Sequence, residues 1–136
     1  MSTPPSFLAS SLYVMVGGGV GSWLRYMVGR AVTGTLGPVA ASAFPWATLT
    51  VNIVGSFAMG LLAGWLARHG TGGEGWRLLL GVGLLGGFTT FSAFGLEFAL
   101  LTERGTPGAA ALYVAVSLAG GFLGPFAGLA IMRAVA

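Results

Sequence analysis

The chain consists of four long runs of hydrophobic residues separated by short polar stretches. The runs extend from about Phe7 to Val32, Trp46 to Ala67, Leu78 to Thr102 and Gly108 to Met132. Each is close to the roughly 20 residues that an α-helix needs to cross about 30 Å of hydrocarbon. The pattern predicts an all-α integral membrane protein of the cell (inner or plasma) membrane, in which residues 1–136 form a single four-span domain.

The connections between the runs are short, and the first of them is rich in Gly, Pro, Ala and Ser. They cover residues 33–44, 68–77 and 103–107, and Pro45 and Pro107 stand where helices begin, a position at which the missing N–H costs nothing. Little of the chain is therefore left to form a soluble catalytic domain. No pairing of a nucleophile with a base and no metal-ligand cluster is visible, so we do not expect an enzyme.

The composition agrees with a membrane protein. Hydrophobic residues make up 55% of the chain and charged residues only 7%, whereas about 25% is usual for soluble domains. Small residues at a spacing of four, which let membrane helices approach closely, recur along the spans. These pairs are Gly17/Gly21, Gly60/Gly64, Gly83/Gly87 and Gly120/Gly124.

The net charge of +3 comes from arginines that are scattered along the chain, which does not favour nucleic-acid binding. Four spans place both termini and the 68–77 connection on one side, with Arg68, Arg77 and Arg133. The other side carries Arg30 and Arg104, and Arg25 as well if its side chain extends outward. Cytoplasmic loops normally carry an excess of Lys and Arg. The near balance leaves two interpretations: a single orientation set by a weak signal, or dual topology with an antiparallel homodimer.

The third run contains an interruption, "GGFTTFSAF" at residues 86–94, near its midpoint. Each glycine costs a helix roughly 1 kcal/mol relative to Ala, and irregular backbone inside a membrane must be buried in protein or face water. We expect a helix broken at mid-membrane. Freed carbonyls there suit a small hard cation such as Na⁺. By themselves Phe91 and Phe94 are typical of packing or of a lipid-facing surface, but beside a break their electropositive edges also suit a desolvated anion.

Polar residues inside the spans form two stripes. Thr48, Asn52 and Ser56 lie on one helix face, and Tyr113 and Ser117 repeat the same spacing. Each stripe by itself is explained as well by helix packing as by a polar pathway. For Glu97 the sequence leaves open a vestibule position or an ion pair with an arginine.

Together these segments resemble the small bacterial fluoride channels known as Fluc or CrcB. The resemblance rests on "GGFTTFSAF", on "GGGVGSWLRY" at 17–26, on "TLTVNIVGSF" at 48–57 and on the Tyr113/Ser117 pair. It implies a dual-topology antiparallel homodimer in the lipid bilayer that passes fluoride through two pores, with one structural Na⁺ at the dimer centre that is not transported.

The resemblance also implies residue roles. Backbone carbonyls of Gly86 and Thr89 would hold the Na⁺, and Arg25 would lie at the mouth of a vestibule. The fluoride path would be bordered by Asn52, Phe91, Phe94, Ser92, Tyr113 and Ser117. Gly121 departs from the family pattern, because a hydroxyl is often found at that position.

Two other functions are compatible with four apolar spans. A proton-coupled antiporter of the small multidrug type needs a carboxylate inside the membrane, and Glu97 is the one candidate in the spans, away from the interruption. A non-transporting accessory subunit would have its interior polar groups satisfied by packing alone.

Overall fold

The computed structural model describes residues 5–69 and 73–135, and the described chain is helical. Its elements are α1 (Phe7–Ala43), α2 (Trp46–His69), α3 (Glu74–Trp76), η2 (Arg77–Leu85), α4 (Gly86–Phe88), α5 (Phe91–Glu103) and α6 (Pro107–Ala134). Four stretches of helix, the third of them formed by α3 to α5 together, are long and apolar enough to cross a membrane. The predicted all-α, four-span, multi-pass membrane protein is thereby confirmed.

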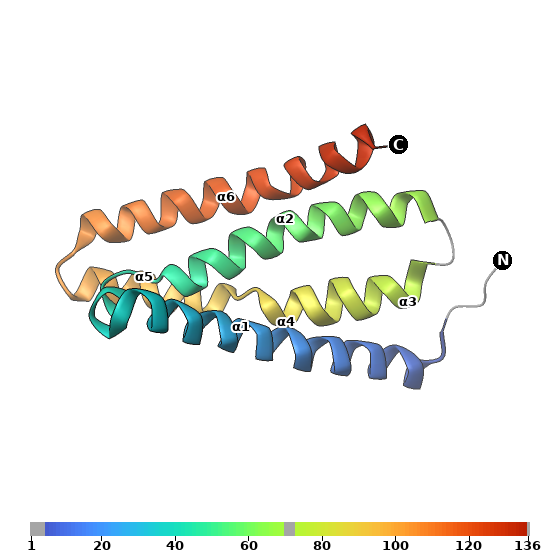
Figure 1. Cartoon of the computed structure of the whole chain (residues 1–136), viewed down its shortest axis with the longest axis horizontal. Coiled ribbons are helices and arrows are strands. Elements are labelled where there is room, and N and C mark those ends of the chain that lie inside the picture. Colours follow the sequence, from blue (N-terminus) through green and yellow to red (C-terminus); the bar gives the residue numbers. More distant parts are fainter. Residues whose placement is uncertain (1–4, 70–72, 136) are drawn as a thin grey trace.

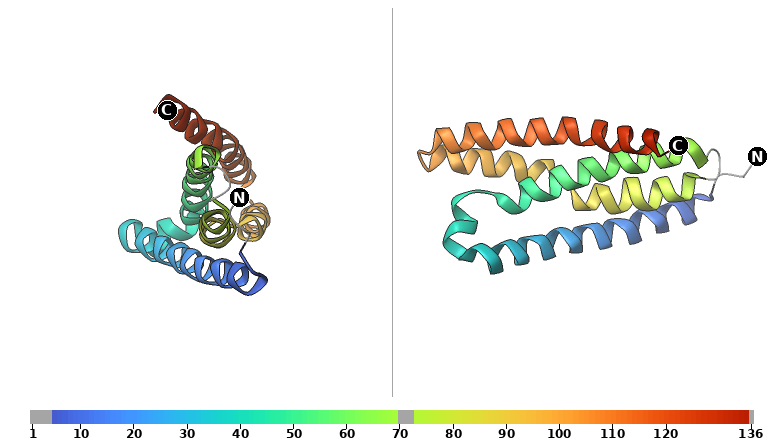
Figure 2. Two further views of the ribbon diagram at one scale, coloured as in Figure 1. Left: turned by 90° about the vertical axis from the view of Figure 1, so that its right-hand side faces the viewer. Right: turned by 45° about the horizontal axis from the view of Figure 1, so that its top comes forward.

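The helices form a bundle in which the third span is shared between two neighbours (Figure 1). Its first half, η2 and α4, packs against α1, whereas α2 packs mainly against α6, and α5 reaches α6 as well. Viewed from the end, α1 and α6 lie at opposite edges with the other helices between them (Figure 2). The start of α1, the end of α6 and the facing ends of α2 and α3 lie at the same end of the bundle, as expected for four spans.

The first helix is longer than predicted. We expected it to end near Val32 and residues 33–44 to form a loop, but α1 continues to Ala43. The helical path is kinked at Gly37, whose φ of 79° and ψ of 160° lie outside the helical region. A left-handed φ is open to glycine, and Pro38 after it occupies the first position of a new helical turn, where proline is favoured. Gly37 and Pro38 therefore redirect the helix instead of ending it.

The glycine pairs produce the close packing expected from their spacing. A Cβ atom at Gly17 or Gly21 of α1 would overlap the carbonyl oxygen of Leu79 or Leu84 in η2. Between α2 and α6, a Cβ at Gly60 would overlap the Pro125 carbonyl. The two backbones in each pair of helices thus lie in direct contact, which larger residues would prevent.

The third span changes its winding twice. Residues Arg77–Leu85 form a π-helix, which the sequence did not predict, and the N–H of Gly86 donates to the carbonyls of both Gly81 and Gly83. Helix α4 then ends at Phe88, and Thr89 and Thr90 have extended backbone, with ψ angles of 160° and 120°. Helix α5 begins at Phe91, where the Thr90 hydroxyl accepts the N–H of Ala93 at 3.2 Å.

Candidate functional site

The side chain of Asn52 holds the extended segment between α4 and α5. Its Oδ1 accepts the N–H of Thr90 at 2.8 Å, and its Nδ2 donates to the carbonyl of Thr90 at 3.0 Å. In a continuous α-helix the N–H of Thr90 would bond to the carbonyl four residues earlier, that of Gly86. Asn52 replaces this helical bond, so the Gly86 carbonyl is released from it.

Arg25 reaches the same segment from the opposite side. Its Nη1 donates to the carbonyl of Thr89 at 3.3 Å, and one turn earlier Ser22 donates to the carbonyl of Gly87 at 3.5 Å. The resemblance implied a place for Arg25 at a vestibule mouth, and that role stays a prediction. In this structure its guanidinium lies against the backbone that the interruption exposes.

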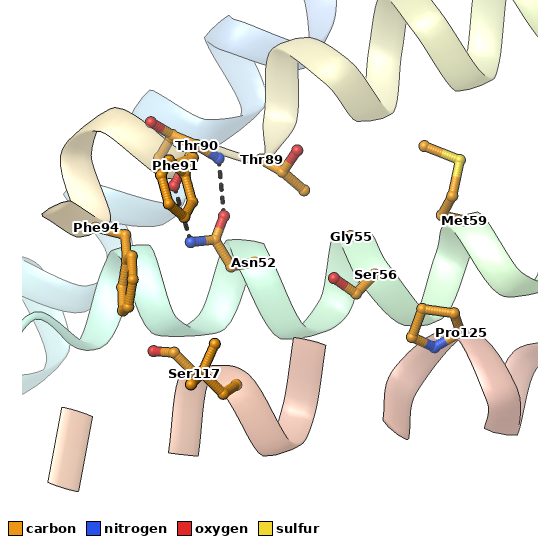
Figure 3. A pocket seen from close by; sticks show the side chains of 11 residues that line it. Asn52, Gly55, Ser56, Met59, Thr89, Thr90, Phe91, Phe94, Ser117 and Pro125 are labelled. Carbon is orange, nitrogen blue, oxygen red and sulfur yellow. Dashed lines mark hydrogen bonds between the residues drawn. The ribbon is translucent and has the colours of Figure 1, made fainter. Parts of the chain in front are cut away.

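A pocket of about 320 Å³ lies beside this segment. Four residues expected along a fluoride path line it, namely Asn52, Phe91, Phe94 and Ser117. They come from α2, α5 and α6 and converge around the extended backbone (Figure 3). The pocket is lined in full by Asn52, Gly55, Ser56, Met59, Thr89, Thr90, Phe91, Phe94, Ser117, Leu118 and Pro125; we call it the Asn52 pocket.

The hydroxyl of Ser117 is the unusual group in this pocket. Its oxygen is buried and has no hydrogen-bond partner within the described chain. Hydroxyls in helices commonly donate to the carbonyl four residues earlier, as those of Ser11, Thr33, Thr35, Thr89 and Thr102 do here. A buried polar group without a partner costs about 1–3 kcal/mol. The Ser117 hydroxyl is therefore available for a ligand that enters the pocket.

The rings of Phe91 and Phe94 border the pocket in different ways. Their centroids are 5.8 Å apart at an interplanar angle of 43°. Phe94 packs on the ring of Tyr113, with centroids 5.1 Å apart, and is partly buried. Phe91 is 83% exposed in the single chain. Packing within this chain therefore partly buries Phe94, whereas Phe91 contacts Phe94 and otherwise lies exposed.

Glu97 belongs to a second polar cluster, on the far side of Phe94. Its Oε1 accepts the hydroxyl of Thr48 at 2.7 Å, and its Oε2 accepts the hydroxyl of Tyr113, also at 2.7 Å. Both partners are hydroxyls and neither is an arginine, and the vestibule position that the sequence left open for Glu97 stays a prediction. One feature of the sequence could have indicated this cluster. Thr48 lies one helical turn before Asn52, and Tyr113 lies one helical turn before Ser117.

A smaller pocket of about 210 Å³ adjoins the Glu97 cluster and is lined by Glu97 and Arg104, among others. Arg104 donates from Nη1 to the carbonyl of Ser42 at 3.0 Å, near the end of α1. Tyr113 is fully buried between Phe94 and Phe44. Its expected position along a fluoride path stays a prediction.

Two further predicted site residues lie outside the Asn52 pocket. Ser92 is exposed, and its Oγ is 3.4 Å from that of Thr90. Gly86 is exposed as well. Both therefore lie on a surface of the single chain, within one turn of the interruption.

The carbonyls of Gly86 and Thr89 fit the chemistry of a Na⁺ site. They are hard oxygen donors, and the interruption takes the Gly86 carbonyl out of its helical bond. The Thr89 carbonyl receives Arg25 but has a second lone pair. The described residues contain no group of three or more His, Cys, Asp or Glu that could hold a metal ion, so a cation here would depend on backbone oxygens.

Three of the four apolar spans line a pocket that contains a buried hydroxyl without a partner in the described chain, so the molecule is a membrane protein with a candidate site between its helices. Residues 12–129 match the family model described as CrcB-like protein, Camphor Resistance (CrcB). The chain therefore belongs to the CrcB family, which confirms the resemblance seen in the sequence.

Relatives of this chain carry the name "Fluoride-specific ion channel FluC". The protein of Novosphingobium aromaticivorans is 58% identical over 95% of this chain and 100% of its own length. That of Sphingopyxis alaskensis is 58% identical over 88% of this chain and 92% of its own. That of Erythrobacter litoralis is 55% identical, with 87% of each chain covered.

Proposed function

We propose that this chain is a fluoride-selective ion channel through which cytoplasmic fluoride leaves passively. The observation that carries the proposal is the buried, unpaired hydroxyl of Ser117 in a pocket that also contains Asn52 and two phenylalanine rings. The names of the relatives, at 55–58% identity over most of both chains, support fluoride as the ion.

Fluoride is small and strongly hydrated, so a pore must replace its water with hydrogen-bond donors. The Asn52 amide has two N–H groups, of which one donates to Thr90, and the second is left for an anion. The Ser117 hydroxyl adds another donor, and the edges of Phe91 and Phe94 carry partial positive charge. These groups attract an anion without a fixed positive charge that would hold it too tightly to leave.

We further propose that two copies assemble as an antiparallel homodimer. Gly86, Phe91 and Ser92 are exposed around a non-helical segment, and lipid cannot satisfy the polar groups of such backbone. A second copy packed on this face would cover them. The nearly equal numbers of arginines at the two ends of the bundle favour insertion in both orientations, which an antiparallel pair requires.

A Na⁺ ion at the dimer centre completes the proposal. Gly86 and Thr89 of each copy would hold it through their carbonyls, and the ion would offset the negative ends of these dipoles without crossing the membrane. One chain offers two such oxygens, fewer than a hard cation usually takes, so the site needs the second copy. Replacing Na⁺ by a large organic cation should lower the melting temperature of the purified dimer. An unchanged melting temperature contradicts the Na⁺ site.

The test of function is fluoride efflux from liposomes that contain only the purified protein. We expect efflux down the fluoride gradient, at a rate that is unchanged when a pH gradient is imposed. Ser117→Ala should slow efflux about tenfold, since one hydrogen bond to a charged group contributes about 1.5 kcal/mol. Ser11→Ala, in which the lost hydroxyl donates to the carbonyl of Phe7 at the start of α1, is the matched control and should leave the rate unchanged.

The same assay separates the alternatives. Efflux that follows the proton gradient would indicate an antiporter, in which Glu97 is the carboxylate to test. Absence of any flux from well-folded protein would leave an accessory subunit as the remaining interpretation.

A further inference from the structure

Helices α2 and α6 run side by side in the same direction (Figures 1 and 2). Their polar residues, spaced by four on each helix, lie near one another at successive turns. At the first level Thr48 and Tyr113 share Glu97. One turn later Asn52 and Ser117 line the same pocket. Because both stripes advance by four residues, the next level pairs Ser56 of α2 with Gly121 of α6.

At this third level α6 provides no side chain. A Cβ atom built on Gly121 would lie 4.0 Å from the Oγ of Ser56, which is the nearest described atom outside the surrounding backbone of α6. The two residues are therefore direct neighbours across the helix seam. Ser56 carries the one side-chain hydroxyl at this level of the seam.

The hydroxyl of Ser56 faces the Asn52 pocket and makes no hydrogen bond to the described chain. Ser56 lines this pocket together with Asn52 and Ser117 (Figure 3). Within residues 5–69 and 73–135 its Oγ forms no hydrogen bond, either to the carbonyl of Asn52 one turn earlier or to another helix. Beyond Ser56 the lining becomes apolar, at Met59 and Pro125.

The backbone of α6 cannot serve in place of this hydroxyl. Carbonyl oxygens are acceptors and repel an anion, and N–H groups inside a helix are already bonded. Pro125 has no N–H to donate to the carbonyl of Gly121 four residues earlier, so this level gains a further acceptor and no donor. An anion that passes Ser117 toward Pro125 meets Ser56 as its next side-chain donor.

We infer that Ser56 is a fluoride-binding residue, which continues the path past Ser117 from α2 at the level where α6 has Gly121. The inference rests on the proposed function and adds a donor to it. It also predicts that the donor can be moved across the seam, because the space beside Gly121 accepts a Cβ at ordinary van der Waals distance.

The test compares three variants in fluoride efflux from liposomes. Ser56→Ala should slow efflux about tenfold, the effect of one hydrogen bond to an ion. Adding Gly121→Ser to Ser56→Ala should bring the rate back to within about threefold of the parent. Adding Gly121→Ala instead supplies the Cβ without a hydroxyl and should not restore it.

Two results would overturn the inference. One is a parent rate in Ser56→Ala, and the other is equal rescue by Gly121→Ala and Gly121→Ser, which would mean that packing alone matters. If Ser56→Ala does not elute as a folded dimer, Ser56→Cys retains the size with a weak donor and must also be slow. A parent protein that passes no fluoride refutes the proposed function itself, whereas a conducting parent with a conducting Ser56→Ala refutes the role of Ser56 alone.

Discussion

The seam between α1 and η2 and the seam between α2 and α6 are both built on glycines, yet they differ in what they enclose. In the first, Gly17 and Gly21 bring two backbones into contact, and a Cβ at Gly83 would lie 2.9 Å from the Cα of Gly17. In the second, close contacts at Gly60 and Gly120 flank a region of hydroxyls and an amide. The first seam leaves no room for a ligand, and the second opens onto the Asn52 pocket.

The difference shows how a small apolar chain combines rigidity with a polar interior. The tight seam fixes η2 and α4 on α1, which brings Arg25 to Thr89 from one side. The polar seam brings Asn52 to Thr90 from the other. The extended residues are thus held by side chains from two helices. Their conformation therefore does not depend on side chains that fill the pocket beside them.

The largest effect, a loss of stability, is expected when a side chain is introduced into the tight seam between α1 and η2. Gly21→Val would drive its Cβ and methyl groups into the backbone of Leu84 and Phe88, and backbone cannot move aside as a side chain can. Overpacking typically lowers the free energy of unfolding by about 1–3 kcal/mol. We expect a loss at or above the upper end of this range, so that little folded Gly21→Val protein is recovered in detergent. Gly19→Val on the same helix has no atom within 4 Å of the new Cβ and should elute normally. Normal elution of Gly21→Val would show that the seam is not tight.

The next largest effect is expected at the polar seam. Asn52→Asp retains the size but removes the donor to the Thr90 carbonyl and, when ionised, adds negative charge to the pocket. We expect fluoride efflux from liposomes to be abolished. Thr50→Ser, a substitution two residues away, serves as the control and should conduct normally. Efflux at the parent rate in Asn52→Asp would remove Asn52 from the pathway.

The two rings should respond differently to replacement. Phe91→Ile and Phe94→Ile should each cut fluoride efflux severely, because both lose an electropositive ring edge. Phe94→Ile should also lower the melting temperature, since Phe94 packs on Tyr113, whereas Phe91 is exposed in the single chain.

Methionine at the same two positions separates the ring edge from its shape. Met is flexible and polarizable and fills gaps, so partial recovery of efflux would favour fit or polarizability over the ring quadrupole. Parent rates in both Ile variants would exclude the rings from the path.

A smaller, partial effect on activity is expected when insertion of the chain into the membrane is biased toward one orientation. The chain has no cysteine, so Thr71→Cys gives a single label in the 68–77 connection, and we expect it to react from both sides of the membrane. Two arginines added to this connection should shift insertion toward one orientation and lower activity in cells. Labelling from one side only in the parent contradicts dual topology.

Much of this architecture is readable from residues alone. Hydrophobic run length predicts four spans because the thickness of the hydrocarbon sets it. The glycine spacing predicts close seams, and "GGFTTFSAF" directs attention to residues 86–94. Helix bounds are less readable: residues 33–43 look like a loop from their Gly, Pro and Ser, yet they continue α1, because Gly37 absorbs the kink before Pro38.

Only the tertiary structure decides which polar groups already have partners. From spacing alone Asn52, Ser56, Tyr113 and Ser117 are equivalent, since each is a polar residue on a helix face. In the fold, Asn52 bonds to Thr90 and Tyr113 to Glu97, whereas the hydroxyls of Ser117 and Ser56 have no hydrogen-bond partner among the residues that the structure describes. Hydrogen bonding depends on distances between helices that are far apart in sequence, whereas hydropathy is a property of each residue alone. For that reason the sequence alone predicts that the chain is a membrane protein, whereas the tertiary structure is needed to find which hydroxyl groups are left without hydrogen bonds.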